Sequence, residues 1–129
     1  MAEAGSESLR RVLLLAGAFE VRGSTATTLR LAEHLPGHGF DPSVVCSSAQ
    51  RLSAEVRKQL SIQEHPGLSN RLVGRLVRRL LARDFADAPP DVIHVQSRRL
   101  ASLGGWLAAA WRRPLVVSVH EVLRRRECL

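Results

Sequence analysis

Three pairs of small or polar residues follow short aliphatic runs in this sequence, and their residue types are suited to chemistry. The pairs are Gly23–Ser24, Gln96–Ser97 and His120–Glu121. An imidazole can transfer a proton or stabilise charge on a reacting oxygen, and a neighbouring carboxylate can orient it. A glutamine side chain keeps its charge state but hydrogen-bonds to hydroxyl groups. A glycine lets the backbone approach a ligand, and a helix that starts beside it offers N–H groups to an anion or a hydroxyl.

Each pair also has an interpretation that needs no ligand. His120 can simply close a turn at the end of a strand, and Gly23 with Ser24 can be an ordinary loop and helix cap. The polar residues Gln96 and Ser97 fit a binding role and a structural role equally well. His94 lies within an aliphatic run, which favours a buried neutral histidine bonded to the backbone.

Several function classes lack their signatures here. No G-x-G-x-x-G follows the first aliphatic run and no Walker lysine is present, which disfavours those two modes of nucleotide binding. No carboxylate pair is placed to hold a metal, so we expect neither a metal nor a cofactor. The remaining histidines and the cysteines show no metal-ligand spacing: His34, His38, His65, Cys46 and Cys128. We expect both cysteines to be reduced in the cytoplasm.

The aliphatic runs and the segments between them predict alternating strands and helices. Strands are expected at 11–16, 43–46, 62–64, 92–95 and 115–119. Helices are expected at 25–35, 49–60, 70–83 and 98–110, the last with small residues for close packing at Ala101, Gly104, Gly105 and Ala108. This alternation predicts an α/β fold: a Rossmann-like, doubly wound parallel sheet of about five strands with helices on both faces. We choose the order 3-2-1-4-5, which brings the three pairs to the crevice beyond the carboxyl ends of the strands.

The chain is strongly basic, and the helix at 70–83 concentrates the charge. The net charge is +7 over 129 residues, and only 4% of the residues are aromatic. This helix has an apolar stripe of Leu72, Val73, Leu76, Val77, Leu80 and Leu81, and a basic face of Arg71, Arg75, Arg78, Arg79 and Arg83. The basic face fits a solvated surface or attachment to an anionic membrane surface. Nucleic-acid binding is disfavoured, because no aromatic residues are interleaved for stacking.

Three motifs together resemble the N-terminal domain of GT-B glycosyltransferases of the family-four, glycogen-synthase-like group. They are Gly23-Ser24 followed by LAEHL at 31–35, PDVIHVQS at 90–97 and RPLVVSVHE at 113–121. The motifs occur in the family's order and cover about residues 11–121. The sequence departs from the family at Ser24, where the family has a second glycine, and at Gln96, where it has a histidine.

The resemblance implies transfer of a sugar from a nucleotide sugar with retention of anomeric configuration. It implies that this domain holds a sugar or a lipid-linked acceptor, with His120 as the catalytic residue. The implied substrate-binding residues are Gly23, Ser24, Gln96, Ser97 and Glu121. The family's nucleotide-binding C-terminal domain is absent from this chain, so we expect no transfer by the chain alone. We expect a disordered tail at 1–10, the family-four-like domain at 11–121 and a basic tail at 122–129.

Two other functions stay open at this point. One is a non-catalytic, truncated paralogue that binds a partner or an anionic membrane through its basic helix. The other is a different Rossmann-like enzyme. We expect a cytoplasmic protein, with peripheral attachment at the inner face of the membrane as a variant, and no nucleic-acid partner. A chain that ends at Leu129 is expected to be marginally stable or to self-associate through an open sheet edge.

Overall fold

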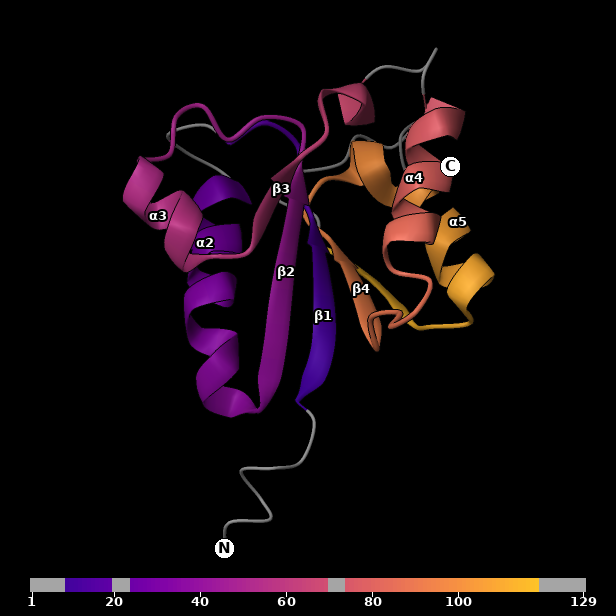
Figure 1. The fold of residues 1–129 in the computed structure, drawn as a ribbon, viewed down its shortest axis with the longest axis horizontal. Helices are drawn as coiled ribbons and strands as arrows, with labels where there is room; N and C mark the ends of the chain where they lie inside the picture. Colours follow the sequence, from indigo (N-terminus) through magenta and orange to yellow (C-terminus); the bar gives the residue numbers. More distant parts are fainter. Residues whose placement is uncertain (1–8, 20–23, 70–73, 119–129) are drawn as a thin grey trace, which may run out of the picture.

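A computed structural model of the chain describes residues 9–19, 24–69 and 74–118. These residues form a five-stranded sheet in the order β3-β2-β1-β4-β5, and every neighbouring pair of strands is parallel (Figure 1). The strands are β1 (Arg10–Leu15), β2 (Phe40–Cys46), β3 (Ile62–Glu64), β4 (Val92–Val95) and β5 (Leu115–Val117). The predicted fold class and strand order are therefore confirmed.

Helices cover both faces of the sheet (Figure 1). The helices α2 (Ser24–His34) and α3 (Ala54–Gln59) lie on one face, and α4 (Gly74–Asp84) and α5 (Ala101–Trp111) lie on the other. Short 3-10 turns complete the connections: η1 (Leu35–His38), η2 (Pro66–Ser69) and η3 (Arg98–Leu100). Alternate residues of β1 divide the core in two, because successive side chains of a strand point to opposite faces. Leu13 and Leu15 pack with α4 and α5, whereas Val12 and Leu14 pack with α2.

The strand β2 begins three residues earlier than the predicted 43–46 and includes a proline. Pro42 pairs with Val12 of β1 on one side. On its other side β3 pairs only from Val44 onwards. The missing N–H of the proline therefore falls where no neighbouring strand needs a donor, which is the position a strand tolerates.

The predicted helix at 49–60 is shorter in the structure, because a serine inside that segment starts α3. The hydroxyl of Ser53 accepts a hydrogen bond from the N–H of Val56 at 3.2 Å. This contact satisfies one of the free donors at the start of α3 and fixes its first turn. The preceding residues form a turn, in which the N–H of Leu52 donates to the carbonyl of Ala49 at 3.0 Å.

Close packing of α5 on the sheet depends on one of its two glycines. A methyl group at Gly104 would overlap with Cγ2 of Val95 and lie 3.0 Å from Cδ1 of Leu115. At Gly105 a methyl group would meet open space. The prediction that small residues let this helix approach the sheet therefore holds for Gly104 and is wrong for Gly105.

The apolar stripe predicted for the segment 70–83 is only partly buried. Val77 and Leu81 are in the core, but Leu76 is 58% exposed and Leu80 is 38% exposed. Residues 70–73 lie outside the described residues. The stripe is wider than the side of the helix that contacts the sheet, so its outer leucines face solvent.

Candidate functional site

The loops that follow β1, β2 and β4 are held together at the carboxyl edge of the sheet. The N–H of Gln96 donates to the carbonyl of Leu15 at 2.8 Å, which extends the β1–β4 pairing past the end of β4. The N–H of Phe19 donates to the carbonyl of Ser48 at 2.9 Å, which keeps the first two loops side by side. In doubly wound sheets, ligands bind beyond the carboxyl ends of the strands, at the point where the strand order reverses.

Buried polar side chains gather at this edge. Among the described residues, the buried polar ones are Thr25, Thr28, Ser47 and Gln96. The two threonines lie in the first turns of α2, which begins at this edge, and the other two residues directly follow β2 and β4. Burial of polar groups costs free energy unless they find hydrogen-bonding partners. Thr25 and Thr28 have interaction partners, whereas both side-chain polar atoms of Gln96 lack a partner among the described residues, so Gln96 marks the candidate site.

Gln96 is the buried polar residue that best indicates a ligand site. It is 1% exposed, and neither its Nε2 nor its Oε1 has a hydrogen-bonding partner within the part of the chain that the structure describes. The register pairs His94 with Leu14, so alternation along the strand directs Gln96 to the face that α2 covers. Leaving such a buried group unsatisfied costs about 1–3 kcal/mol. A hydroxyl group both donates and accepts, so it is the kind of ligand group that satisfies this amide.

The other predicted site residues differ in how far the structure describes them. Ser97 is half-buried next to Gln96, and its side chain does not cap η3. Ser24 is described only as the first residue of α2. Gly23, His120 and Glu121 lie outside the described residues. The structure thus brings Gln96 and Ser97 to the edge at which α2 begins, and a binding or catalytic role stays a prediction for all six residues.

His94 differs from its predicted state. It is half-buried rather than buried, because its neighbour across the sheet, Val116 of β5, is itself exposed. Its Nε2 lies 2.6 Å from the hydroxyl of Ser118. The N–H of Ser118 donates to the carbonyl of Val95 at 2.9 Å, so this serine joins β4 to β5 beside the candidate site. Ser118 lies within the motif at 113–121, but no site role is predicted for it from the sequence.

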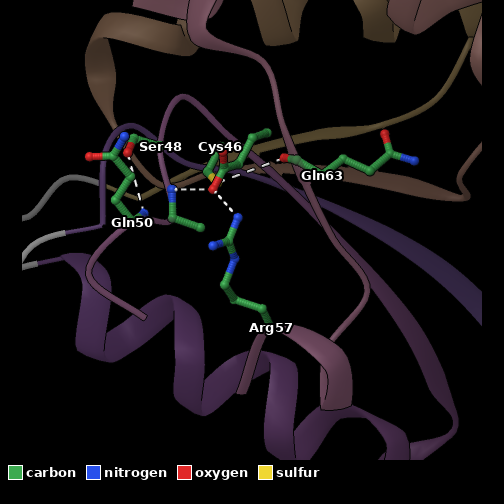
Figure 2. Close-up of polar contacts among 7 residues, drawn as sticks. Cys46, Ser48, Gln50, Arg57 and Gln63 are labelled. Carbon is green, nitrogen blue, oxygen red and sulfur yellow. Dashed lines mark hydrogen bonds and ion pairs between the residues drawn. The ribbon is translucent and has the colours of Figure 1, made fainter. Parts of the chain in front are cut away.

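Polar contacts at the ends of β2 and β3 are structural. The carboxylate of Glu64 accepts the N–H of Ala49 at 3.0 Å and forms an ion pair with Arg57, which reaches it from α3 (Figure 2). The thiol of Cys46 donates to the carbonyl of Gln63 at 3.7 Å. Burial, and to a smaller extent the charge of Glu64, raises the pKa of the Cys46 thiol to about 11. A thiol that keeps its proton is a poor nucleophile, so Cys46 offers no covalent chemistry near neutral pH.

Other regions of the described structure offer less. A cavity of about 120 Å³ lies at the amino end of β2, with Ala32 of α2, Pro42 and Leu60 in its walls. This volume is well below the roughly 300–1,000 Å³ of ordinary ligand pockets. No three His, Cys, Asp or Glu residues within 9–19, 24–69 and 74–118 are grouped to hold a metal ion.

The sequence profile of Glycosyltransferase Family 4 matches residues 21–127. The chain belongs to this family. The predicted resemblance to the family-four glycosyltransferases is therefore confirmed, and the chain is a glycosyltransferase-like domain. A search of the curated proteins found no match to the sequence.

Solved structures place this Glycosyltransferase Family 4 domain among Rossmann-like folds. A glycosyltransferase from Rickettsia africae ESF-5 is similar with a TM-score of 0.70 and 18% identity, over 92% of this chain and 31% of that one. MurG from Acinetobacter baumannii is similar with a TM-score of 0.60 and 16% identity, over 84% of this chain and 34% of that one. This chain thus spans about one third of the length of both proteins.

A third solved structure with a similar fold is named as a hydrogenase and not as a glycosyltransferase. The C-terminal domain of the PF1911 hydrogenase from Pyrococcus furiosus is similar with a TM-score of 0.61 and 11% identity, over 88% of this chain and 93% of that one. The fold alone therefore does not identify the chemistry, and the assignment to the family depends on the sequence profile.

Proposed function

We propose that this domain holds the acceptor in a sugar transfer from a nucleotide sugar, with retention of anomeric configuration. The supporting observation is the buried, unsatisfied amide of Gln96 at the carboxyl edge, between the ends of β1 and β4. An acceptor sugar presents hydroxyl groups, which match this amide as donor and as acceptor. Membership of Glycosyltransferase Family 4 supports sugar transfer as the reaction class.

The proposed roles follow from the chemistry of each side chain. Gln96 and Ser97 hydrogen-bond to acceptor hydroxyls, and Gly23 with Ser24 lets the backbone at the start of α2 approach the substrate. His120 donates to a sugar hydroxyl or stabilises charge on the reacting oxygen, and Glu121 orients its imidazole. The acceptor is a sugar or a lipid-linked sugar.

In this proposal, the donor site lies in a second domain outside this chain. The support is that the two similar glycosyltransferases are about three times longer than this chain. We therefore expect the chain alone to bind acceptor sugars and to transfer none. Cys46 is a buried free thiol, which fits the proposed cytoplasmic location.

A binding experiment tests the acceptor site directly. The ¹⁵N-labelled chain is titrated with millimolar glucose, galactose, mannose and N-acetylglucosamine while the side-chain amide signals are followed by NMR. At least one sugar is expected to shift the Gln96 amide, and Gln96→Met is expected to lose that binding. Gln63→Met is the matched control, because Gln63 is exposed on β3. Equal binding by Gln96→Met and the wild type would contradict the proposed site.

A transfer assay tests the reaction. Nucleotide sugars are supplied to the chain with and without a separately expressed C-terminal half. Turnover is expected only with both halves present. No turnover in either condition would count against sugar transfer and in favour of a different Rossmann-like enzyme or a non-catalytic paralogue.

A further inference from the structure

The outward side of α4 exposes leucines next to arginines. Leu76 and Leu80 are 58% and 38% exposed, one helical turn apart. Arg75, Arg79 and Arg83 lie beside them on the same helix and are exposed as well. Among the described residues, none of these arginines forms an ion pair. The side of α4 that does not pack on the sheet is therefore both basic and apolar.

A tryptophan from the neighbouring helix extends this surface. Trp106 of α5 is 37% exposed. The guanidinium of Arg78 lies 5.2 Å from the centre of its ring, which is a cation–π contact between α4 and α5. We call Arg75, Leu76, Arg79, Leu80 and Arg83, together with Arg78 and Trp106, the α4 surface.

Charge is distributed unevenly between two segments of the chain. The segment 74–113, which includes α4 and α5, has eight arginines against three aspartates. The segment 24–69, which includes α2 and α3, has four basic and four acidic residues. Of these eight arginines, four lie in α4, and α5 has no charged residue, so the positive charge of this helical layer is concentrated on α4.

We propose that the α4 surface docks the domain on an anionic lipid bilayer. Arginine pairs with lipid phosphates through its planar guanidinium. Leucine and tryptophan enter the boundary between headgroups and acyl chains, where an aromatic ring with one polar edge is favoured. No helix of the described part of the chain is long and apolar enough to cross a membrane, so the contact is with the bilayer surface.

The composition of this surface favours a bilayer over other anionic partners. A nucleic acid offers phosphates but no apolar layer for Leu76 and Leu80, and single-stranded binding needs several stacking aromatics rather than one. A bilayer offers both features at once, because charged headgroups form its surface and acyl chains lie beneath them. This proposal does not depend on the acceptor site, which lies at the carboxyl edge of the sheet.

Vesicle binding tests the proposal. The chain is sedimented with vesicles of 30% phosphatidylglycerol in phosphatidylcholine, and with pure phosphatidylcholine. Binding is expected only to the anionic vesicles and is expected to fall as NaCl is raised. Arg75→Gln with Arg79→Gln is expected to weaken the partition coefficient roughly thirty-fold, from the usual contribution of each arginine near the headgroups. Arg30→Gln with Arg51→Gln removes the same charge from exposed positions outside the α4 surface and is the matched control.

The apolar part of the surface has its own test. Leu76→Gln is expected to reduce binding even at high salt, where attraction between charges is screened. Trp111→Phe leaves Trp106 as the single tryptophan, and its emission is expected to shift to shorter wavelength on anionic vesicles. Thermal melts by circular dichroism confirm that each variant folds.

Three results would overturn the proposal. The first is equal partition of the Arg75/Arg79 variant and the Arg30/Arg51 control. The second is equal binding to neutral and anionic vesicles. The third is binding of a labelled oligonucleotide by a chain that does not bind vesicles, which would assign the surface to nucleic acid.

Discussion

Asp91 and Arg11 exchange two hydrogen bonds between the amino ends of β4 and β1. The N–H of Arg11 donates to Oδ2 of Asp91 at 2.7 Å, and the N–H of Asp91 donates to the carbonyl of Arg11 at 2.8 Å. The pair contributes to the alignment of β4 with β1, which continues in the pairing of Val12 with Val92. The alignment of β4 in turn decides that Gln96, rather than its neighbour, is buried on the α2 face of the sheet. The aspartate of the PDVIH motif therefore has a structural role.

Replacement of Asp91 is expected to lower stability modestly. Asp91→Ala removes the acceptor of the Arg11 N–H, and because the contact is exposed the cost is about 1 kcal/mol. Asp91→Asn keeps an acceptor oxygen and is expected to lose less. Urea unfolding followed by circular dichroism measures both variants. If the alanine variant were as stable as the wild type, Asp91 would have no structural role.

The two adjacent glycines of α5 are expected to respond in opposite directions. Gly104→Ala forces a methyl group against Val95 and is expected to cost about 1–3 kcal/mol. Gly105→Ala meets open space and is expected to stabilise by about 0.5–1 kcal/mol, because alanine favours the helix. The same urea titration compares them. Stabilisation by both substitutions would mean that α5 lies farther from the sheet than described.

The raised pKa of Cys46 predicts slow thiol labelling and a loss of stability in alkali. In a Cys128→Ser background, alkylation of Cys46 at pH 8 is expected to be about a hundred-fold slower than for a thiol with the ordinary pKa. In the unfolded chain the thiol ionises near its ordinary pKa of 9.0, but in the folded protein only near about 11. Its contribution to stability is therefore complete below pH 9 and is lost between about pH 9 and 11.

The control for this prediction separates Cys46 from other titrating groups. Cys46→Ala is expected to flatten the pH dependence of the free energy of unfolding between about pH 9 and 11. Only the slopes are compared, because the substitution also changes the packing. An unchanged slope, or rapid labelling at pH 8, would show that the thiolate is accessible in the folded protein.

The unsatisfied amide of Gln96 predicts that an apolar replacement stabilises the sugar-free domain. Gln96→Met has a similar volume and removes two unpaired polar atoms, so a gain of about 1–2 kcal/mol is expected. Gln63→Met, on exposed β3, is expected to change stability by less than about 0.5 kcal/mol. Destabilisation by Gln96→Met would show that the amide is satisfied in solution.

The sequence predicted the sheet well because most of its strands contain short aliphatic runs bounded by proline, glycine and polar residues. The strands at 62–64 and 92–95 have the predicted bounds, and the order of all five strands is confirmed. The extent of burial on α4 was less predictable. Helical periodicity places Leu76, Val77, Leu80 and Leu81 in one stripe, but the angle at which the helix meets the sheet decides which of them are covered.

The candidate site was predictable in part. Gln96 and Ser97 are expected at the carboxyl edge from their position after a strand. The burial of Gln96 depends on side chains from other elements, and no sequence motif indicates that Thr28 and Ser47 are buried as well. The contact of His94 with Ser118 depends on how β5 aligns with β4, which residue spacing does not determine.

The four arginines of α4 make its helical layer more positive than the layer of α2 and α3, which gives the described residues an electric dipole component across the sheet. An electric field rotates such a molecule before contact is made. Near an anionic layer, the domain therefore turns its α4 and α5 side toward that layer. At physiological salt the field extends only about 8 Å from the layer. The torque therefore acts in the last stage of approach, and it aligns the domain at no cost in specific contacts.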